Sequence, residues 1–230
     1  MRSKIKRVAL LTKNVIKNPT RAVSKVTRKL NNEGITGFVY AVRKKLSTSE
    51  LSPENMIADM NEAYQIWRSN NALSENDLQI QRELSTKFKK KPVISIITPV
   101  YQPPVDVLED LIKSVLDQTY PYFELCLAEV AQNKECIALI KKYQQLDSRV
   151  KARFMPTNGG IAIDSNACIE LASGDYIALL DHDDLLSPDA LFENAKMINE
   201  DDYDFLYSDK DKIDENGRHY EPMFKPKWSP

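Results

Sequence analysis

The sequence is poor in cysteine and has no long apolar run. Its 230 residues include 3 cysteines, and none of them forms a C-x-x-C pair. Neither a disulfide framework nor a cysteine-based zinc site is indicated, so we expect reduced, mostly buried thiols. No apolar stretch approaches the roughly 20 residues that a membrane-spanning helix needs. The N-terminus also lacks the features of a signal peptide, and a cytoplasmic protein is therefore the expectation.

Acidic residues are scarce in the first fifth of the chain. Residues 1–50 hold 13 Lys and Arg against 2 acids, a net charge of +11, so the whole-chain charge of −1 leaves −12 for the remaining 180 residues. Apolar residues recur among the basic ones at helical spacing, which predicts a basic amphipathic helical segment. Such a segment suits peripheral binding to the anionic inner face of a membrane, at about 1 kcal/mol per basic side chain. Packing as a solvated basic helix on the rest of the chain is an equal alternative.

Aromatic residues are also scarce in this basic segment, where only Phe38 and Tyr40 occur. Nucleic acid is therefore not expected as a partner, because single-strand binding needs aromatic side chains among the basic ones. Residues 51–90 follow as a helical connector. Met56, Met60, Tyr64 and Trp67 would share one face of its first helix. A second helix over about residues 74–88 would end before Pro92.

From Val93 onward the pattern alternates between strands and helices. Strands are predicted at residues 93–98, 123–128, 150–155, 176–181 and 204–209, and helices at 106–118, 135–146, 161–172 and 188–200. This order predicts an α/β fold, a Rossmann-like open and mostly parallel sheet with helices on both faces. Ligands of such sheets bind at the carboxyl ends of the strands.

Three acids in four residues, Asp181-His182-Asp183-Asp184, come directly at the end of a predicted strand. Oxygen ligands of this kind select hard cations such as Mn2+ or Mg2+, which can bridge to phosphates. The Gly159-Gly160 pair, without a P-loop lysine, fits a nucleotide diphosphate whose departure the metal assists. The alternative is that these acids only favour the start of the helix after Pro188, and the short motif alone leaves both interpretations open.

Four stretches carry a family resemblance: PVISIITPVYQPP, SVLDQTYPYFELCLA, NGGIAIDSNACIELASGDYIALLDHDDLLSPDAL and DFLYSDKDKIDENGRHYEPMFKPKWSP. Together they resemble the inverting family 2 glycosyltransferases of GT-A fold, in particular those of bacterial cell-surface polysaccharides. The resemblance implies that residues 91–230 form the nucleotide-sugar-binding half of such an enzyme. It also implies transfer of a sugar from a nucleotide-sugar donor to a glycan or lipid-linked acceptor, with Mn2+ or Mg2+.

The resemblance assigns roles by position. Pro99 and Tyr101 would line the base and ribose pocket, and Asp181 would face the ribose side of the donor. The metal ligands would be Asp181 and Asp183. The remaining donor-binding candidates are Glu129, Asn158, Gly159 and His182.

Two departures and one missing part accompany the resemblance. The family's Asp-Asp after the second strand is here Glu129-Val130, and a valine cannot accept a hydrogen bond. Lys210 and Lys227 stand where the family has acids. The base that deprotonates the acceptor would lie beyond Pro230, so no catalytic residue is assigned and donor binding without transfer is expected. The alternative function is a truncated or diverged, non-catalytic remnant that at most binds nucleotide or a membrane surface.

Overall fold

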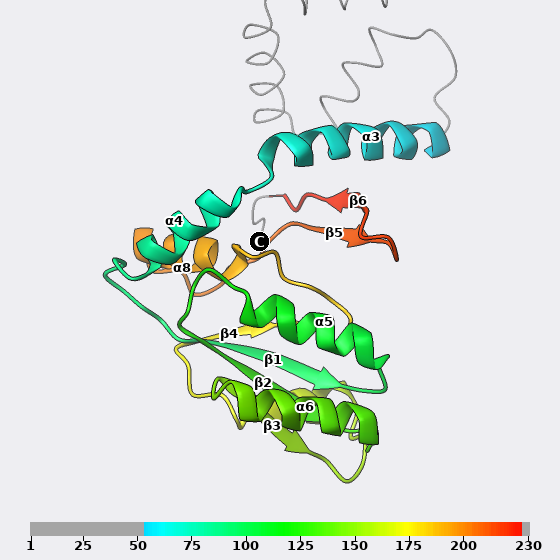
Figure 1. Ribbon diagram of the computed structural model, residues 1–230, viewed down its shortest axis with the longest axis vertical. Helices are drawn as coiled ribbons and strands as arrows, with labels where there is room; N and C mark the ends of the chain where they lie inside the picture. Colours follow the sequence, from blue (N-terminus) through cyan, green and yellow to red (C-terminus); the bar gives the residue numbers. More distant parts are fainter. Residues whose placement is uncertain (1–52, 227–230) are drawn as a thin grey trace, which may run out of the picture. The chain divides into compact units, whose positions relative to one another are not determined.

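The computed structural model describes residues 53–226, which fall into two compact units (Figure 1). The larger unit comprises residues 73–206, and the smaller one joins residues 53–72 to residues 207–226. The segment expected to be one helical connector is thus divided between the two units. The basic segment 1–50 lies outside the described residues, together with the expectations attached to it. Within residues 53–226 no helix combines the length and the apolar character that crossing a membrane requires.

The larger unit is built on a four-stranded parallel sheet. Its strands are β1 (Ile94–Val100), β2 (Phe123–Glu129), β3 (Val150–Phe154) and β4 (Tyr176–Leu179). They lie in the order β3-β2-β1-β4, so that β1 pairs with β2 on one side and with β4 on the other. Four of the five predicted strands and the predicted open parallel sheet are confirmed.

Helices cover both faces of this sheet. The helices of the larger unit are α4 (Glu75–Ser85), α5 (Val105–Leu116), α6 (Lys134–Leu146), α7 (Ile161–Ile169) and α8 (Ala190–Glu200). α5 and α6 lie together on one face (Figure 1), whereas α7 packs on the other. The chain steps in one direction from β1 to β3 and then reverses to reach β4. Right-handed crossovers place the helix of the reversed step, α7, on the opposite face.

The two sides of β1 pack into two separate apolar clusters. Ile96 and Val100 belong to the cluster beneath α5 and α6, whereas Ile97 packs with Cys126 and with Cys168 of α7. All three cysteines are free and buried, as predicted. Burial raises the pKa of the Cys126 thiol to about 12 and that of Cys168 to about 11. Both thiols therefore stay protonated at neutral pH and are unreactive.

An ion pair with a buried carboxylate joins the strands near their amino ends. Glu124, only 6% exposed, lies 2.5 Å from the Lys151 ammonium and accepts hydrogen bonds from Ser95 Oγ at 2.7 Å and the Ser173 amide at 2.5 Å. Burial alone would raise the pKa of Glu124. The hydrogen bonds from Lys151, Ser173 and Ser95 outweigh burial and lower this pKa to about 2. The contacts of one side chain thus connect β1, β2, β3 and the loop before β4.

We expect this ion pair to make the stability of the protein depend on acid pH. The pKa of Glu124 falls on folding, so its stabilisation is present above about pH 5 and is lost as the pH falls toward 2. A pKa shift of this size corresponds to about 3 kcal/mol. Urea unfolding at several pH values gives the free energy of unfolding of the wild type and of Glu124→Gln. The difference between the two measures the contribution of Glu124. A difference that stays constant between pH 6 and pH 2 would contradict the assignment.

The smaller unit packs helix α3 (Pro53–Asn71) on a hairpin of β5 (Lys210–Ile213) and β6 (His219–Met223). Asp211 joins the two parts, because its Oδ2 accepts a hydrogen bond from the Tyr64 hydroxyl at 2.5 Å and lies 2.7 Å from His219 Nδ1. Burial, and then this contact with Asp211, raises the pKa of Tyr64. Tyr64 stacks on Trp67 with ring centroids 5.9 Å apart and packs on Met60, so these three residues of the predicted apolar face lie together.

The prediction of a strand at residues 204–209 is wrong. The structure describes these residues and shows no strand in them, and Phe205 is 68% exposed. An apolar run becomes a strand only where a neighbouring backbone pairs with it. The next strand is β5, which pairs antiparallel with β6 across a turn where Gly217 has φ +74° and Asp214 Oδ1 accepts the Asn216 and Arg218 amides.

Candidate functional site

The candidate residues follow the carboxyl ends of the four parallel strands. In the sheet register Val100 of β1 lies opposite Glu129 of β2, and Ile97 lies opposite Leu179 of β4. The chain runs from β1 to β2 on one side of β1, whereas β4 pairs with β1 on the other side. This is the topological switch point of the sheet, where ligands of open α/β folds bind. The structure thus brings the segments after β1 and β4 side by side.

The segment after β1 presents Tyr101. Pro99 is half-buried within the strand, whereas the Tyr101 side chain is 48% exposed. The next residue, Gln102, has φ +51°, and the buried Pro103 then turns the chain toward α5. The Val130 amide donates to the Val100 carbonyl at 3.1 Å, so the segments that follow β1 and β2 start in contact. Tyr101 therefore offers an exposed ring at the switch point.

The segment after β2 follows Glu129, which was expected to contact the donor but does not face the rim. Glu129 is fully buried, and its carboxylate accepts hydrogen bonds from the amides of Ala131 at 3.2 Å, Gln132 at 3.0 Å and Asn133 at 3.1 Å. Val130 is buried as well, in the cluster beneath α7. Glu129 thus binds its own chain, and it shapes the loop that leads into α6.

Removing the Glu129 carboxylate should destabilise this loop and the whole unit. Glu129→Ala leaves three backbone amides without an acceptor, and we expect a loss of about 2–4 kcal/mol in the free energy of unfolding. Glu200→Ala, at an exposed position on α8, is the control and should change it by less than about 0.5 kcal/mol. Denaturant unfolding measures both. Equal stabilities of the two variants would show that the loop does not need the carboxylate.

The segment after β3 is the Asn158-Gly159-Gly160 loop, which is exposed and leads into α7. One residue that sequence reasoning missed lies beneath it. Asp164, only 4% exposed, accepts the Gly159 amide at 3.0 Å through Oδ1. The signal available in the sequence was an acid that follows three apolar residues in the first turn of a helix, where it favours the helix amino end.

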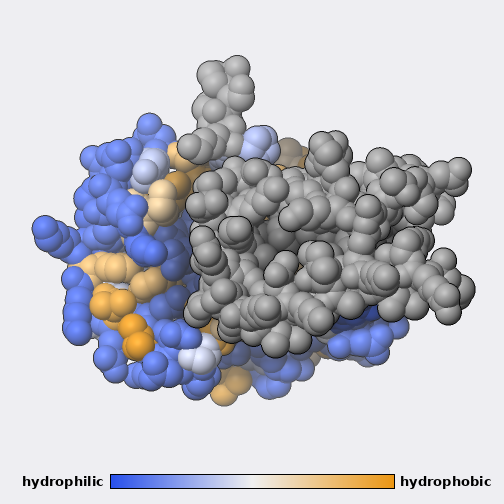
Figure 2. Space-filling model, turned by 90° about the horizontal axis from the view of Figure 1, so that it is seen from above, coloured by the Kyte–Doolittle hydropathy of each residue, from blue (hydrophilic) through white to orange (hydrophobic). Residues whose placement is uncertain are grey.

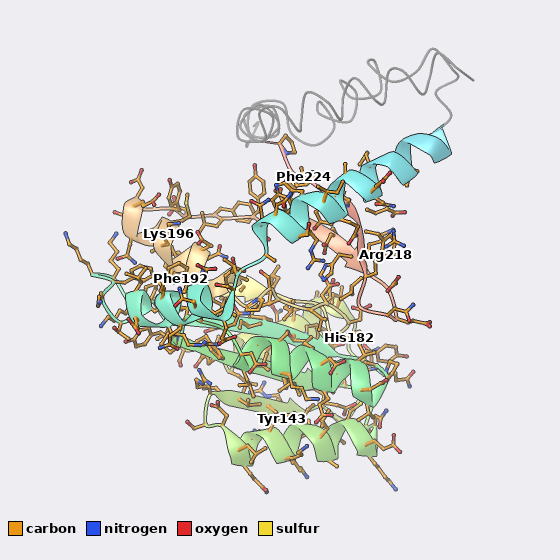
Figure 3. All side chains as sticks on the ribbon, turned by 45° about the horizontal axis from the view of Figure 1, so that its top comes forward. Tyr143, His182, Phe192, Lys196, Arg218 and Phe224 are labelled. Carbon is orange, nitrogen blue, oxygen red and sulfur yellow. The ribbon has the colours of Figure 1, made fainter. Side chains whose placement is uncertain are left out.

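The segment after β4 places the acids in solvent. Leu180 is buried and its amide donates to the Ile97 carbonyl at 3.2 Å, which extends the pairing with β1 by one residue. Asp181 and Asp183 are then exposed, and His182 between them is half-buried. Figure 3 labels His182 at the end of the sheet. The Asp184 amide donates to the Asp181 carbonyl at 3.1 Å and closes a turn. The acids therefore lie at the rim of the sheet and not in its core.

The oxygen ligands after β4 fit a divalent cation that takes its remaining ligands from a substrate. Mg2+ is typically bound by one or two carboxylates together with substrate phosphates and water. Asp181 and Asp183 supply two exposed carboxylates of this kind. Among residues 53–226 no group of three or more His, Cys, Asp or Glu side chains is placed to hold a metal ion by itself.

Comparison with known proteins gives the family. The model of the family described as Glycosyl transferase family 2 matches residues 95–229, more than half of the chain. This chain belongs to glycosyl transferase family 2. The uncharacterized protein y4gI of Sinorhizobium fredii is 42% identical over 149 residues, which are 64% of this chain and 16% of that protein.

Two further relatives of this family 2 chain have descriptive names. The O-antigen biosynthesis protein RfbC of Myxococcus xanthus is 30% identical over 151 residues, 65% of this chain and 12% of that protein. The putative teichuronic acid biosynthesis glycosyltransferase TuaG of Bacillus subtilis is 33% identical over 110 residues, 48% of this chain and 43% of that protein. The chain thus spans 12% to 43% of the length of these three relatives.

Two solved structures are similar to parts of this family 2 chain. S. aureus TarS 1–349 is 24% identical with a TM-score of 0.43, covering 46% of this chain and 32% of that chain. The mannosyltransferase PcManGT of Pyrobaculum calidifontis, in complex with GDP-Man and Mn2+, is 15% identical with a TM-score of 0.44 and covers 62% of this chain and 43% of that chain.

Proposed function

We propose that the larger unit binds a nucleotide-sugar donor at the switch point between β1 and β4, and that the protein transfers the sugar to a cell-surface glycan or a lipid-linked acceptor. One observation carries the proposal: in a family 2 chain, an exposed Tyr101 after β1 lies at the same rim as exposed Asp181 and Asp183 after the adjacent β4. The names of RfbC and TuaG support a cell-surface polysaccharide as the product.

Each rim segment has a separate role in this proposal. Pro99 and Tyr101 hold the base and ribose, and Asp181 faces the ribose side of the donor. Asp181 and Asp183 hold Mn2+ or Mg2+, which neutralises charge on the diphosphate leaving group when it is bound. The remaining contacts come from Asn158, Gly159 and His182. Glu129, whose carboxylate is occupied by three amides, supports its loop and does not touch the donor.

The proposal assigns no base to the described residues. Two acids of the smaller unit, Asp209 and Asp211, would be candidates by their chemistry. Asp209 Oδ1 accepts the Lys225 amide at 2.7 Å, and Asp211 is engaged by Tyr64 and His219. A base must accept the proton of the acceptor hydroxyl within hydrogen-bond reach, whereas these contacts give both carboxylates a structural role within the smaller unit. Donor binding is therefore the activity that this chain can be tested for directly.

Metal-dependent nucleotide binding tests the proposal. Removing a residue that only hydrogen-bonds to a metal ligand typically weakens metal affinity about 10- to 100-fold. Asp183→Ala removes a ligand itself, so it should weaken Mn2+-dependent nucleotide binding at least about tenfold. Asp189→Ala is a matched control, because Asp189 precedes α8 without capping it through its side chain. Calorimetry with UDP, GDP and dTDP, in Mn2+ and in EDTA, measures both variants. Wild-type binding that EDTA and Asp183→Ala leave unchanged would contradict the metal assignment.

The same proposal includes peripheral attachment to an anionic membrane through residues 1–50, on the basis of their net charge of +11. Binding to vesicles containing phosphatidylserine should fall as salt shortens the Debye length from about 8 Å at 0.15 M to about 3 Å at 1 M. Co-sedimentation of the full chain and of a variant lacking residues 1–50 measures it. The idea fails if the shortened variant sediments equally well, or if neutral vesicles bind the full chain as strongly.

A further inference from the structure

We propose that Asp164 is a positioning residue for donor binding, acting through the Asn158-Gly159-Gly160 loop. The inference rests on the proposed function, which gives this loop to the donor. Asp164 itself touches no part of the rim surface, because it is 4% exposed beneath the loop. Its effect on a ligand must therefore pass through the backbone that it holds.

Asp164 binds two successive glycines of the loop. Its Oδ1 accepts the Gly159 amide at 3.0 Å, and its own amide donates to the Gly160 carbonyl at 3.0 Å. The loop adds one contact of its own, because Asn158 Oδ1 accepts the Gly160 amide at 2.7 Å. The bond to Gly160 is the first backbone bond of α7, which any residue at this position could make, so the Asp164 side chain acts on the loop through the Gly159 amide.

The steric surroundings fix the same loop conformation. Gly160 has φ +85°, a backbone conformation that side chains disfavour. A Cβ at Gly159 would lie 2.5 Å from Ile163 Cγ2, so the loop backbone lies directly against the first turn of α7. Asp164 and Ile163 thus hold Gly159 from the same turn. A loop held in one conformation binds a ligand without the entropic cost of ordering it.

The position of the acceptor oxygen and the charge of Asp164 have opposite consequences for an anionic ligand. The oxygen holds the Gly159 amide, which favours binding. The negative charge lies in the first turn of a helix and reduces the attraction of that helix end for a phosphate. Asparagine keeps an acceptor oxygen without the charge, whereas glutamate keeps the charge and displaces the oxygen by one methylene. These two variants separate position from charge.

The experiment compares Asp164→Asn, Asp164→Glu and Asp164→Ala with the wild type in calorimetry with UDP and GDP in Mn2+. We expect Asp164→Asn to bind as tightly as the wild type or tighter, and Asp164→Glu and Asp164→Ala to bind at least about fivefold more weakly, as expected for loss of one positioned hydrogen bond. Melting temperatures report folding separately. Wild-type affinity in a folded Asp164→Ala or Asp164→Glu would overturn the proposal, and the Asn and Glu pair decides the question if Asp164→Ala does not fold.

A second readout does not depend on the ligand. The chain has only 6 glycines, so the Gly159 amide can be assigned in a 15N spectrum by glycine labelling and mutation. Its exchange with solvent should be slow in the wild type and in Asp164→Asn, and faster in Asp164→Glu. Equal exchange of the Gly159 amide in the wild type, Asp164→Asn and Asp164→Glu would show that the Asp164 side chain does not fix the loop. If the loop behaves as expected but the wild type binds no nucleotide, the proposed function fails, and with it the donor role of Asp164.

Discussion

The pairing of β1 with a strand on each side is the constraint on which the candidate site depends. Because β2 and β4 flank β1 in parallel, three segments leave the sheet at the same rim. The reversal of direction between β3 and β4 also places α7 on the face opposite α5 and α6. An exposed tyrosine after β1 and exposed acids after β4 thus become neighbours through backbone pairing alone, although about 80 residues separate them in sequence.

The chain uses its carboxylates in two different ways around this sheet. Glu124, Glu129 and Asp164 are buried, and each accepts at least one backbone amide. Glu124 also has a lysine partner, whereas Glu129 and Asp164 hold the loops that follow β2 and β3. A buried carboxylate is tolerated when such donors replace its water. On the face drawn in Figure 2, the coloured residues are mainly hydrophilic, with a group of apolar residues among them.

The parts of the fold that follow from local pattern could be predicted, and the parts that depend on distant backbone could not. The β-branched run of β1 and the apolar faces of α5 and α6 specify their own structure, because each buries a periodic set of side chains. The run at 204–209 has three apolar residues, Phe205, Leu206 and Tyr207, but forms no strand with any described part of the chain. The hairpin that was missed had a local signal in Asn216-Gly217, a pair typical of tight turns. Glu129 carried no sign of its buried role, and Asp164 only its place in the first turn of a helix, since both roles depend on where the neighbouring loops fold back.

The contrast between buried and exposed acids answers why a strand should end on Asp181-His182-Asp183-Asp184. Like charges at this density would be costly in the core, and the structure leaves Asp181 and Asp183 exposed to solvent, whose high dielectric constant weakens their repulsion. Carboxylates that are buried and already accept backbone amides, such as Glu129 and Asp164, have little capacity left for a cation from solvent. Exposed carboxylates can exchange water for a cation and for the phosphates that the cation brings. The rim after β4 is therefore suited to binding, while the buried acids after β2 and β3 are suited to holding the loops around it.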